Sequence, residues 1–212
     1  SKIAYRDFNK SKNIILNNKI NLENSISTHG HRTIFNNIDV FYFSSNRKGG
    51  FGGMDIWFSI IDEFGKFGEP INAGNRINTN FDEITPFYNT WTGELYFSSN
   101  INEKVSGFDI YKSKGELNYW NSSIKIDELC SNLDDIYISF FDSISGYFSS
   151  NRPPSLQSND SNCCNDIFSF KYPELNEKKI TPPDSIIKQL PISLFFHNDE
   201  PKPLVGISKR ST

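Results

Sequence analysis

Short runs of β-branched and aromatic residues, separated by polar and glycine-containing segments, follow one another along most of the chain. One such run, "MDIWFSII" at 54–61, lacks the apolar spacing of an amphipathic helix. The preceding run ends at Ser45, and four glycines lie between the two runs, at 49–53. A glycine-rich loop that follows a strand binds phosphate where a helix comes next. Because a second strand comes next here, the pattern predicts a loop between strands and no nucleotide site.

The phrase "YFSSN" occurs three times, beginning at Tyr42, Tyr96 and Tyr147. The copies begin 54 and 51 residues apart, a period that is typical of propellers and solenoids. Each copy is followed, after a loop, by an aspartate, an isoleucine and an aromatic residue. The three aspartates are Asp55, Asp109 and Asp166. The chain therefore contains repeated units of one design.

The middle copy predicts four short antiparallel strands, at 82–89, 95–100, 108–113 and 122–126. Four such strands in about fifty residues make one propeller blade. We therefore expect an all-β fold, a β-propeller of four-stranded antiparallel blades followed by an extended C-terminal linker. The expected parts are a half blade at 1–27, blades at about 28–80, 81–132 and 133–172, and a linker and tail at 173–212 that leads towards a further domain.

The N-terminal segment is expected to follow the register of the repeat, with Ile20 over Ile71 and Ile26 over Ile77. On this alignment residues 3–20 supply the third and fourth strands of an earlier blade. The chain then begins in the middle of a blade.

Composition and charge narrow the choice of function. The chain has 19 Phe and 9 Tyr but one Met, which suits sheets better than helices. Its formal net charge of -3 supplies no basic field for nucleic acid or anionic lipid. No apolar run reaches the roughly 18 residues of a transmembrane helix. We expect no cofactor, no nucleic-acid partner and no membrane-spanning helix.

Several residues of the loops after the repeated strand are predicted to have a structural role. The three repeat aspartates each begin a strand after a tight loop, where a carboxylate can accept backbone N–H bonds. The other expected loop residues are Asn46, Arg47, Gly49, Gly50, Gly52, Gly53, Asn100, Asn151 and Arg152. The middle copy has Ile101 in the place of the arginine, so the arginine is dispensable to the repeat.

Two acidic pairs, Asp82-Glu83 and Asp134-Asp135, open the innermost strand of a predicted blade, near the mouth of a central channel. Carboxylates there can bind a cation or a partner's lysine, or act as an acid and a base. An equal alternative is that they cap the crossing between blades. Since no matched nucleophile accompanies them, we predict no catalytic residue and a non-enzymatic function.

His29 and His31 flank Gly30 in a segment expected to cross between blades. Two histidines without a third ligand indicate a metal only weakly. Solvated loop histidines are the favoured interpretation, and no metal site is predicted.

The words "YFSSNRKGGFGGMDIW", "INTNFDEITPF" and "GELYFSSN" follow one another in the order of a known repeat. The chain resembles the TolB-type propeller repeat carried by OmpA-family cell-envelope proteins of Bacteroidetes-like bacteria, over residues 3 to about 172. The resemblance implies a protein-interaction or scaffolding module in an outer-membrane-associated envelope complex. Its partners would be outer-membrane or periplasmic proteins, in the periplasm or at the cell surface.

The segment 190–203 is similar to the one that leads, in those proteins, into an OmpA-like peptidoglycan-binding domain. Peptidoglycan is therefore expected as a partner only through a domain outside this sequence. Two other functions stay open: a propeller enzyme that acts on glycans or peptides, and a sensor of muropeptides or other small ligands.

Cys130, Cys163 and Cys164 are too few and too badly spaced for a zinc site. In the repeat register Cys130 lies in a crossing between blades and the other two in an enlarged loop, and both segments emerge on the same face. A bridge from Cys130 to either one would close a loop of about 34 residues and stabilise the fold by roughly 3 to 4 kcal/mol. It would require an oxidising compartment. The alternative is three buried thiols.

Overall fold

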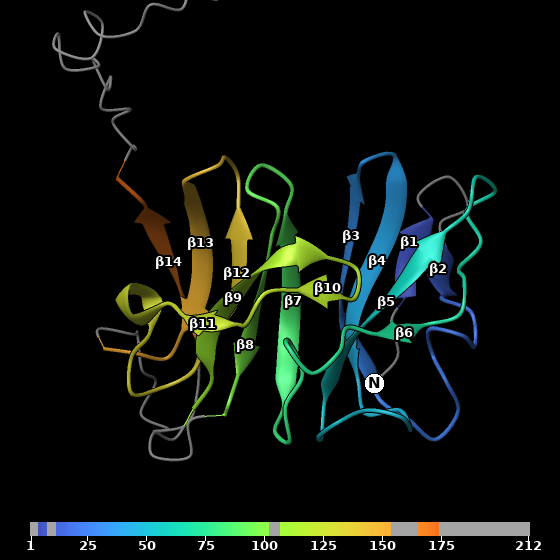
Figure 1. Cartoon of the computed structure of the whole chain (residues 1–212), viewed down its shortest axis with the longest axis horizontal. Coiled ribbons are helices and arrows are strands. Elements are labelled where there is room, and N and C mark those ends of the chain that lie inside the picture. Colours follow the sequence, from blue (N-terminus) through green and yellow to red (C-terminus); the bar gives the residue numbers. More distant parts are fainter. Residues whose placement is uncertain (1–3, 8–11, 102–106, 154–164, 174–212) are drawn as a thin grey trace, which may run out of the picture. The chain divides into compact units, whose positions relative to one another are not determined.

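The computed structural model describes residues 4–7, 12–101, 107–153 and 165–173 (Figure 1). Antiparallel strands make up the regular structure of these segments, together with one 3-10 turn, η1 (Asp127–Leu129). None of the described helical turns has the length and apolar character to cross a membrane. The predicted all-β, antiparallel class is confirmed.

Three antiparallel sheets lie side by side in chain order (Figure 1). The first sheet has four strands in sequential order: β3 (Ser27–Phe35), β4 (Ile38–Ser45), β5 (Asp55–Ile61) and β6 (Ile71–Asn72). The second sheet has five: β7 (Glu83–Asn89), β8 (Glu94–Ser99), β9 (Asp109–Glu116), and the short β10 (Tyr119–Trp120) and β11 (Ile124–Lys125), which both pair with β9. The third sheet has three: β12 (Asp135–Phe140), β13 (Ser145–Ser150) and β14 (Asp166–Lys171). A separate pair consists of β1 (Ala4–Asp7) and β2 (Lys12–Ile15).

The repeated words occupy the same place in every sheet. The last serine of each "YFSSN" pairs with the repeat aspartate across the two middle strands, as Ser45 with Asp55 and Ser99 with Asp109. The first strand of each sheet contains a bulge, and one residue of that bulge has a positive φ angle. These residues are His29, Thr85 and Tyr137. The three sheets are thus copies of one backbone design, down to an unusual conformation for a non-glycine residue.

The core lies between neighbouring sheets. Tyr42 of β4 packs in one cluster with Tyr88 and Phe97 of the second sheet, whereas its neighbours Phe41 and Phe43 belong to a cluster on the other face. A strand covered on both faces needs apolar side chains on both, which explains why the repeated strands read as continuous apolar runs. The cluster between the second and third sheets comprises Tyr96, Ile110, Ile126, Leu129, Ile138, Phe140 and Phe148.

The first strands of the three sheets are neighbours, because β7 contacts both β3 and β12. The described strands form separate sheets and do not close into a ring. The middle repeat was expected to have one fourth strand and instead has two short ones, β10 and β11. The expected linker, apart from Pro173, lies outside the described residues.

The expected alignment of Ile20 with Ile71 is wrong. The Ile20 carbonyl accepts a hydrogen bond from Arg47, as the Leu129 carbonyl does from Arg152. Ile20 is therefore equivalent to Leu129 of the second crossing, whose counterpart in the first crossing is Ile77. The chain takes seven steps from Ile20 to the first residue of β3 but six from Ile77 to the first residue of β7. The segment before β3 is therefore one residue longer than the equivalent segment before β7.

Candidate functional site

The predicted polar residues gather at the segments that join one sheet to the next. The first crossing, residues 73–82, joins β6 to β7, and the second crossing, residues 126–134, joins β11 to β12. In an antiparallel sheet these crossings and the loops between second and third strands lie at one end, which we call the crossing end. The turns within the hairpins lie at the other, the hairpin-turn end.

Each crossing is fastened to the preceding sheet by one side chain. In the first crossing the Asn78 amide oxygen accepts the Ile56 N–H at 2.8 Å, and the amide nitrogen donates to the Ile56 carbonyl at 2.9 Å. In the second crossing the Cys130 sulfur accepts the Ile110 N–H at 3.2 Å and lies 3.6 Å from the Ile110 carbonyl oxygen. Burial raises the pKa of Cys130 to about 12, which keeps the group a thiol. The thiol thus takes the place of the asparagine amide.

Glu83 and Asp135, the second residues of the acidic pairs, are fully buried. The Glu83 carboxylate accepts the Thr79 N–H at 2.8 Å and the Thr79 hydroxyl at 2.6 Å. Asp135 accepts the same two groups of Ser131, at 2.6 and 2.9 Å. These carboxylates therefore cap the turn at the end of each crossing.

Asp82 and Asp134, the first residues of the pairs, bind the loop that precedes the third strand. The Asp82 carboxylate accepts the Met54 N–H at 2.7 Å, and Asp134 accepts the Phe108 N–H at 3.0 Å. The predicted loop residues Asn100 and Asn151 complete the arrangement by accepting the backbone N–H groups of Asp82 and Asp134, both at 2.9 Å. Of the two alternatives for the acidic pairs, capping of the crossing describes these contacts.

The glycine-rich loop encloses Asp55. The carboxylate accepts the N–H groups of Phe51 and Gly52 at 2.7 and 3.0 Å and the Asn72 amide at 2.7 Å. A Cβ atom on Gly52 would lie 2.2 Å from the Phe81 carbonyl oxygen, so the loop has to pass this crossing without a side chain. Close approach of backbones explains the glycines, and Gly49 in addition has a φ of 95°. Gly50 and Gly53 have equally close neighbours in Asp55 and Asp82.

Asp109 occupies the same position in the second sheet. Lys125 donates to it at 2.7 Å, in the place of Asn72. Its buried Oδ1 atom has no hydrogen-bond partner among the described residues. The residues equivalent to Phe51 and Gly52 are 105 and 106, which lie outside them. Asp166 pairs with Ser150 at the start of β14, and residues 154–164 of the loop before it also lie outside.

Arg47 and Arg152 hold the crossing that precedes their own sheet. The Arg47 guanidinium donates to the Ile20 carbonyl at 2.7 Å and to the Ser45 hydroxyl at 3.2 Å. It lies 4.7 and 5.4 Å from the Phe43 and Trp57 ring centroids.

Arg152 repeats this arrangement with the Ser150 hydroxyl and the Leu129 carbonyl, over Phe148 and Phe168 at 4.8 and 5.5 Å. It also forms an ion pair with Asp135 at 2.5 Å. Arg47 has no carboxylate in the equivalent place, and burial lowers the pKa of its guanidinium to about 10.

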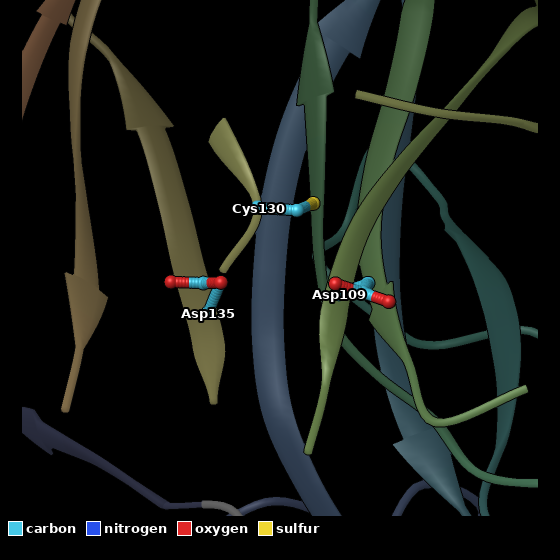
Figure 2. Close-up of side chains that lie close together, drawn as sticks. All are labelled: Asp109, Cys130 and Asp135. Atoms are coloured by element: carbon cyan, nitrogen blue, oxygen red, sulfur yellow. The ribbon is translucent and has the colours of Figure 1, made fainter. Parts of the chain in front are cut away.

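Figure 2 shows Asp109, Cys130 and Asp135 close together at the second crossing, with one ligand atom of each within 4.8 Å of the others. Carboxylates and a thiol are metal-binding groups in principle. Here Lys125 pairs with Asp109 and Arg152 with Asp135, and the Cys130 pKa lies far above neutrality. The group is thus balanced in charge from within the chain, and it serves the crossing.

A small pocket of about 200 Å³ lies where the three first strands meet, and we call it the bulge pocket. His29, His31, Thr85, Phe87 and Tyr137 line it. The rings of His29 and Tyr137 meet edge to face at 5.2 Å. The interpretation of the histidines as solvated loop residues is wrong, because both lie in β3 and are partly buried.

The two histidines of the bulge pocket favour the neutral form and have ring nitrogens available for hydrogen bonds. Burial lowers the pKa of both imidazoles. Within the described residues, His29 Nδ1 and His31 Nε2 are buried and have no hydrogen-bond partner. Two unpaired ring nitrogens in one pocket are a feature that the sequence did not reveal.

The hairpin-turn end has a different surface. Four aromatic side chains of the described segments are more than half exposed, and all four lie in or beside hairpin turns: Phe64 (86%), Trp91 (58%), Tyr119 (77%) and Phe141 (57%). At the crossing end the most exposed aromatic residue described is Phe51, at 49%. The most exposed aromatic rings of the described residues therefore lie at the hairpin-turn end.

Cys130 forms no disulfide with a described residue. Cys163 and Cys164 lie outside the described residues, so the bridge stays a prediction.

Comparison of the chain with models of known protein families, with curated proteins and with solved structures finds no match.

Proposed function

We propose that this chain is part of a β-propeller and acts as a non-enzymatic protein-interaction module. The repeated antiparallel sheets, with their first strands adjacent and with β4 and β8 buried on both faces, support the propeller assignment. The strict repetition of the crossing contacts supports it as well, because blades of one propeller are joined in one way.

The observation that carries the proposal is the contrast between the two ends. Aromatic side chains exposed to solvent are enriched at protein interfaces, where they supply large contact areas at low cost in conformational entropy. Phe64, Trp91, Tyr119 and Phe141 are such side chains, and they all lie at the hairpin-turn end. The carboxylates of the crossing end are bound within the chain, which speaks against their use as an acid and base.

The envelope location rests on the resemblance to the TolB-type repeat of OmpA-family proteins. On that basis the partners are outer-membrane or periplasmic proteins of an envelope complex. The proposed module would act as a scaffold that holds them.

Affinity purification of the tagged full-length protein from detergent-solubilised envelopes tests this proposal. We expect envelope proteins to co-purify in stoichiometric amounts with the wild type and to be lost with the double variant Trp91→Ser, Phe141→Ser. The matched control is Phe51→Ser at the crossing end, which should retain them. A solitary wild-type protein, or equal capture by both variants, would refute the proposal.

A small-ligand sensor is the second candidate, and the bulge pocket favours it. His29 Nδ1 and His31 Nε2 can accept hydrogen bonds from a ligand, and Tyr137 offers a ring. A thermal shift with muropeptides that disappears in His31→Phe but persists in the exposed control Arg32→Ala would support this candidate. No shift with the wild type would exclude muropeptides as the ligand.

A further inference from the structure

The second sheet lacks the arginine that the first and third sheets have, and the space of that arginine is open. Ile101 follows β8 in the place of Arg47 and Arg152. Its N–H donates to the Ser99 hydroxyl at 3.3 Å, as the N–H groups of the two arginines donate to Ser45 and Ser150 at 3.3 and 3.1 Å. The backbone is therefore the same in all three sheets, and only the side chain differs.

Beside Ile101 lies a cavity of about 230 Å³, which we call the Ile101 pocket. The residues that contact a guanidinium in the other two sheets have counterparts here, and all of them line this cavity. Ser99 corresponds to Ser45 and Ser150, and Ile77 corresponds to Ile20 and Leu129. Two aromatic rings complete the set.

These rings are Phe97 and Tyr111, which stack at 5.9 Å with an interplanar angle of 20°. The rings of Phe148 and Phe168, over which the Arg152 guanidinium lies, stack at 5.7 Å and 24°. The aromatic wall of a guanidinium site is thus already formed in the second sheet, with the same geometry as in the occupied one.

The charge of the pocket points to a cation. Glu83 lines it and forms no ion pair with any described residue, whereas the equivalent Asp135 is paired with Arg152. The Ser99 hydroxyl donates to the Glu83 carboxylate at 2.8 Å and can still accept a hydrogen bond. Ser45 does both, since it donates to the Ile26 carbonyl at 2.7 Å while it accepts from Arg47.

Arg76 also lines the pocket, but its side chain is engaged at the rim. Its guanidinium donates to the Ser122 hydroxyl at 2.8 Å, and its carbonyl oxygen accepts from Ser123 at 2.5 Å. Among the described residues, its side chain forms no hydrogen bond or ion pair with Ile77, Ser99 or Glu83.

We propose that the Ile101 pocket binds a guanidinium group from outside the chain, in the place that Arg47 and Arg152 fill from within. The planar cation would lie over Phe97 and Tyr111 and donate to the Ser99 hydroxyl, with the Glu83 carboxylate below it. An arginine side chain of a partner polypeptide and a free guanidinium compound share this chemistry. The proposal stands independently of the interaction surface at the hairpin-turn end.

Titration of the full chain with methylguanidine and with methylammonium, followed by NMR shifts of the Tyr111 and Phe97 rings, tests the site. We expect saturable binding of methylguanidine and roughly tenfold weaker binding of methylammonium, which lacks the planar fork. A capped Gly-Arg-Gly peptide distinguishes the source: tighter binding of the peptide indicates a partner's arginine, and equal binding indicates a free compound. Absence of saturable methylguanidine binding would overturn the proposal.

Three variants locate the site. Ile101→Arg should fill the pocket from within, raise the melting temperature and abolish methylguanidine binding. Glu83→Gln should weaken binding roughly tenfold, through loss of one charged contact. Arg152→Ile, the reverse change in the third sheet, should create a second binding site. If Ile101→Arg binds methylguanidine as tightly as the wild type, the assignment is wrong, and this result does not depend on the folding of the other variants.

Discussion

The two ends of the repeated sheets differ in what their side chains do. At the crossing end, acidic, amide and guanidinium groups are bound to each other and to the backbone, and most are buried. At the hairpin-turn end, aromatic rings are exposed, and the side chains of Asp62, Asn89 and Asp142 bind the backbone of their own turn. We therefore expect substitutions of the bound polar groups at the crossing end to lower stability, whereas those of the exposed rings at the hairpin-turn end should change mainly what the protein binds.

The largest effect is expected at Asp135. Asp135→Ala leaves the Arg152 guanidinium without its carboxylate, and loss of one partner of a buried ion pair costs about 3 to 5 kcal/mol. Asp135→Ser copies the first sheet, where Ser27 lies 3.3 Å from Arg47, and should cost less. Urea denaturation measures both. A loss below about 1 kcal/mol in Asp135→Ala would show that the ion pair does not hold the second crossing.

The two crossings should respond unequally to loss of their fastening side chain. Asn78→Ala leaves the buried Ile56 N–H unpaired and the Ile56 carbonyl with only the Ala73 N–H, and it should lower the free energy of unfolding by about 2 to 3 kcal/mol. Cys130→Ala removes weaker sulfur contacts and should cost about 1 kcal/mol. Cys130→Asn, which copies the first crossing, should be tolerated. Equal losses for the two alanine variants would contradict the weaker role of the thiol, and a strongly destabilising Cys130→Asn would contradict the equivalence of amide and thiol.

Glu83 predicts a pH dependence. Burial raises the pKa of this carboxyl in the folded protein above its usual 4.5, and the hydrogen bonds from Thr79 and Ser99 only partly oppose this. The folded state therefore holds the proton more tightly than the unfolded state. The resulting stabilisation is complete below the unfolded pKa and is lost as pH rises through the folded pKa.

The measurement is the difference in unfolding free energy between wild type and Glu83→Gln from pH 4 upward. The wild type should lose stability relative to the variant as pH rises from about 4.5. A difference that stays constant with pH, or that changes in the opposite direction, would show that Glu83 does not titrate as the buried geometry requires.

The smallest effect on stability is expected at the hairpin-turn end. The double variant Trp91→Ser, Phe141→Ser removes exposed rings, and each surface substitution should change the free energy of unfolding by no more than about 0.5 kcal/mol. The same denaturation experiment checks this. A loss of about 2 kcal/mol or more would mean that these rings serve packing.

The sequence predicted the positions of the repeated strands better than the contacts of the site residues. The repeated "YFSSN" phrase and the strand pattern placed β4, β8 and β13, because the first two are buried on both faces and the third repeats their sequence. The bulge at His29 escaped prediction, since the one extra residue interrupts the alternation of the strand. The role of Cys130 escaped as well, because nothing in the sequence relates a thiol to the amide of Asn78 until both are seen on the same backbone groups.

The acidic pairs show most clearly what the sequence alone does not predict. Their position at the start of β7 and β12 was predicted, but the choice between an open channel mouth and a buried cap depends on where the crossing backbone turns. That turn is set by Thr79 and Ser131, whose hydroxyl and N–H groups face the carboxylates. The sequence does show that Ile101 replaces the arginine of the other two repeats. It does not show that a cavity lies beside Ile101.

Hydrogen–deuterium exchange of the chain alone and in complex with its captured envelope partners tests the division of the two ends most directly. We predict that the partner slows exchange in the hairpin turns at 62–66, 90–93, 117–120 and 141–144 and leaves the crossings at 73–82 and 126–134 unchanged. Protection that appears in the crossings and not in the turns would contradict the account.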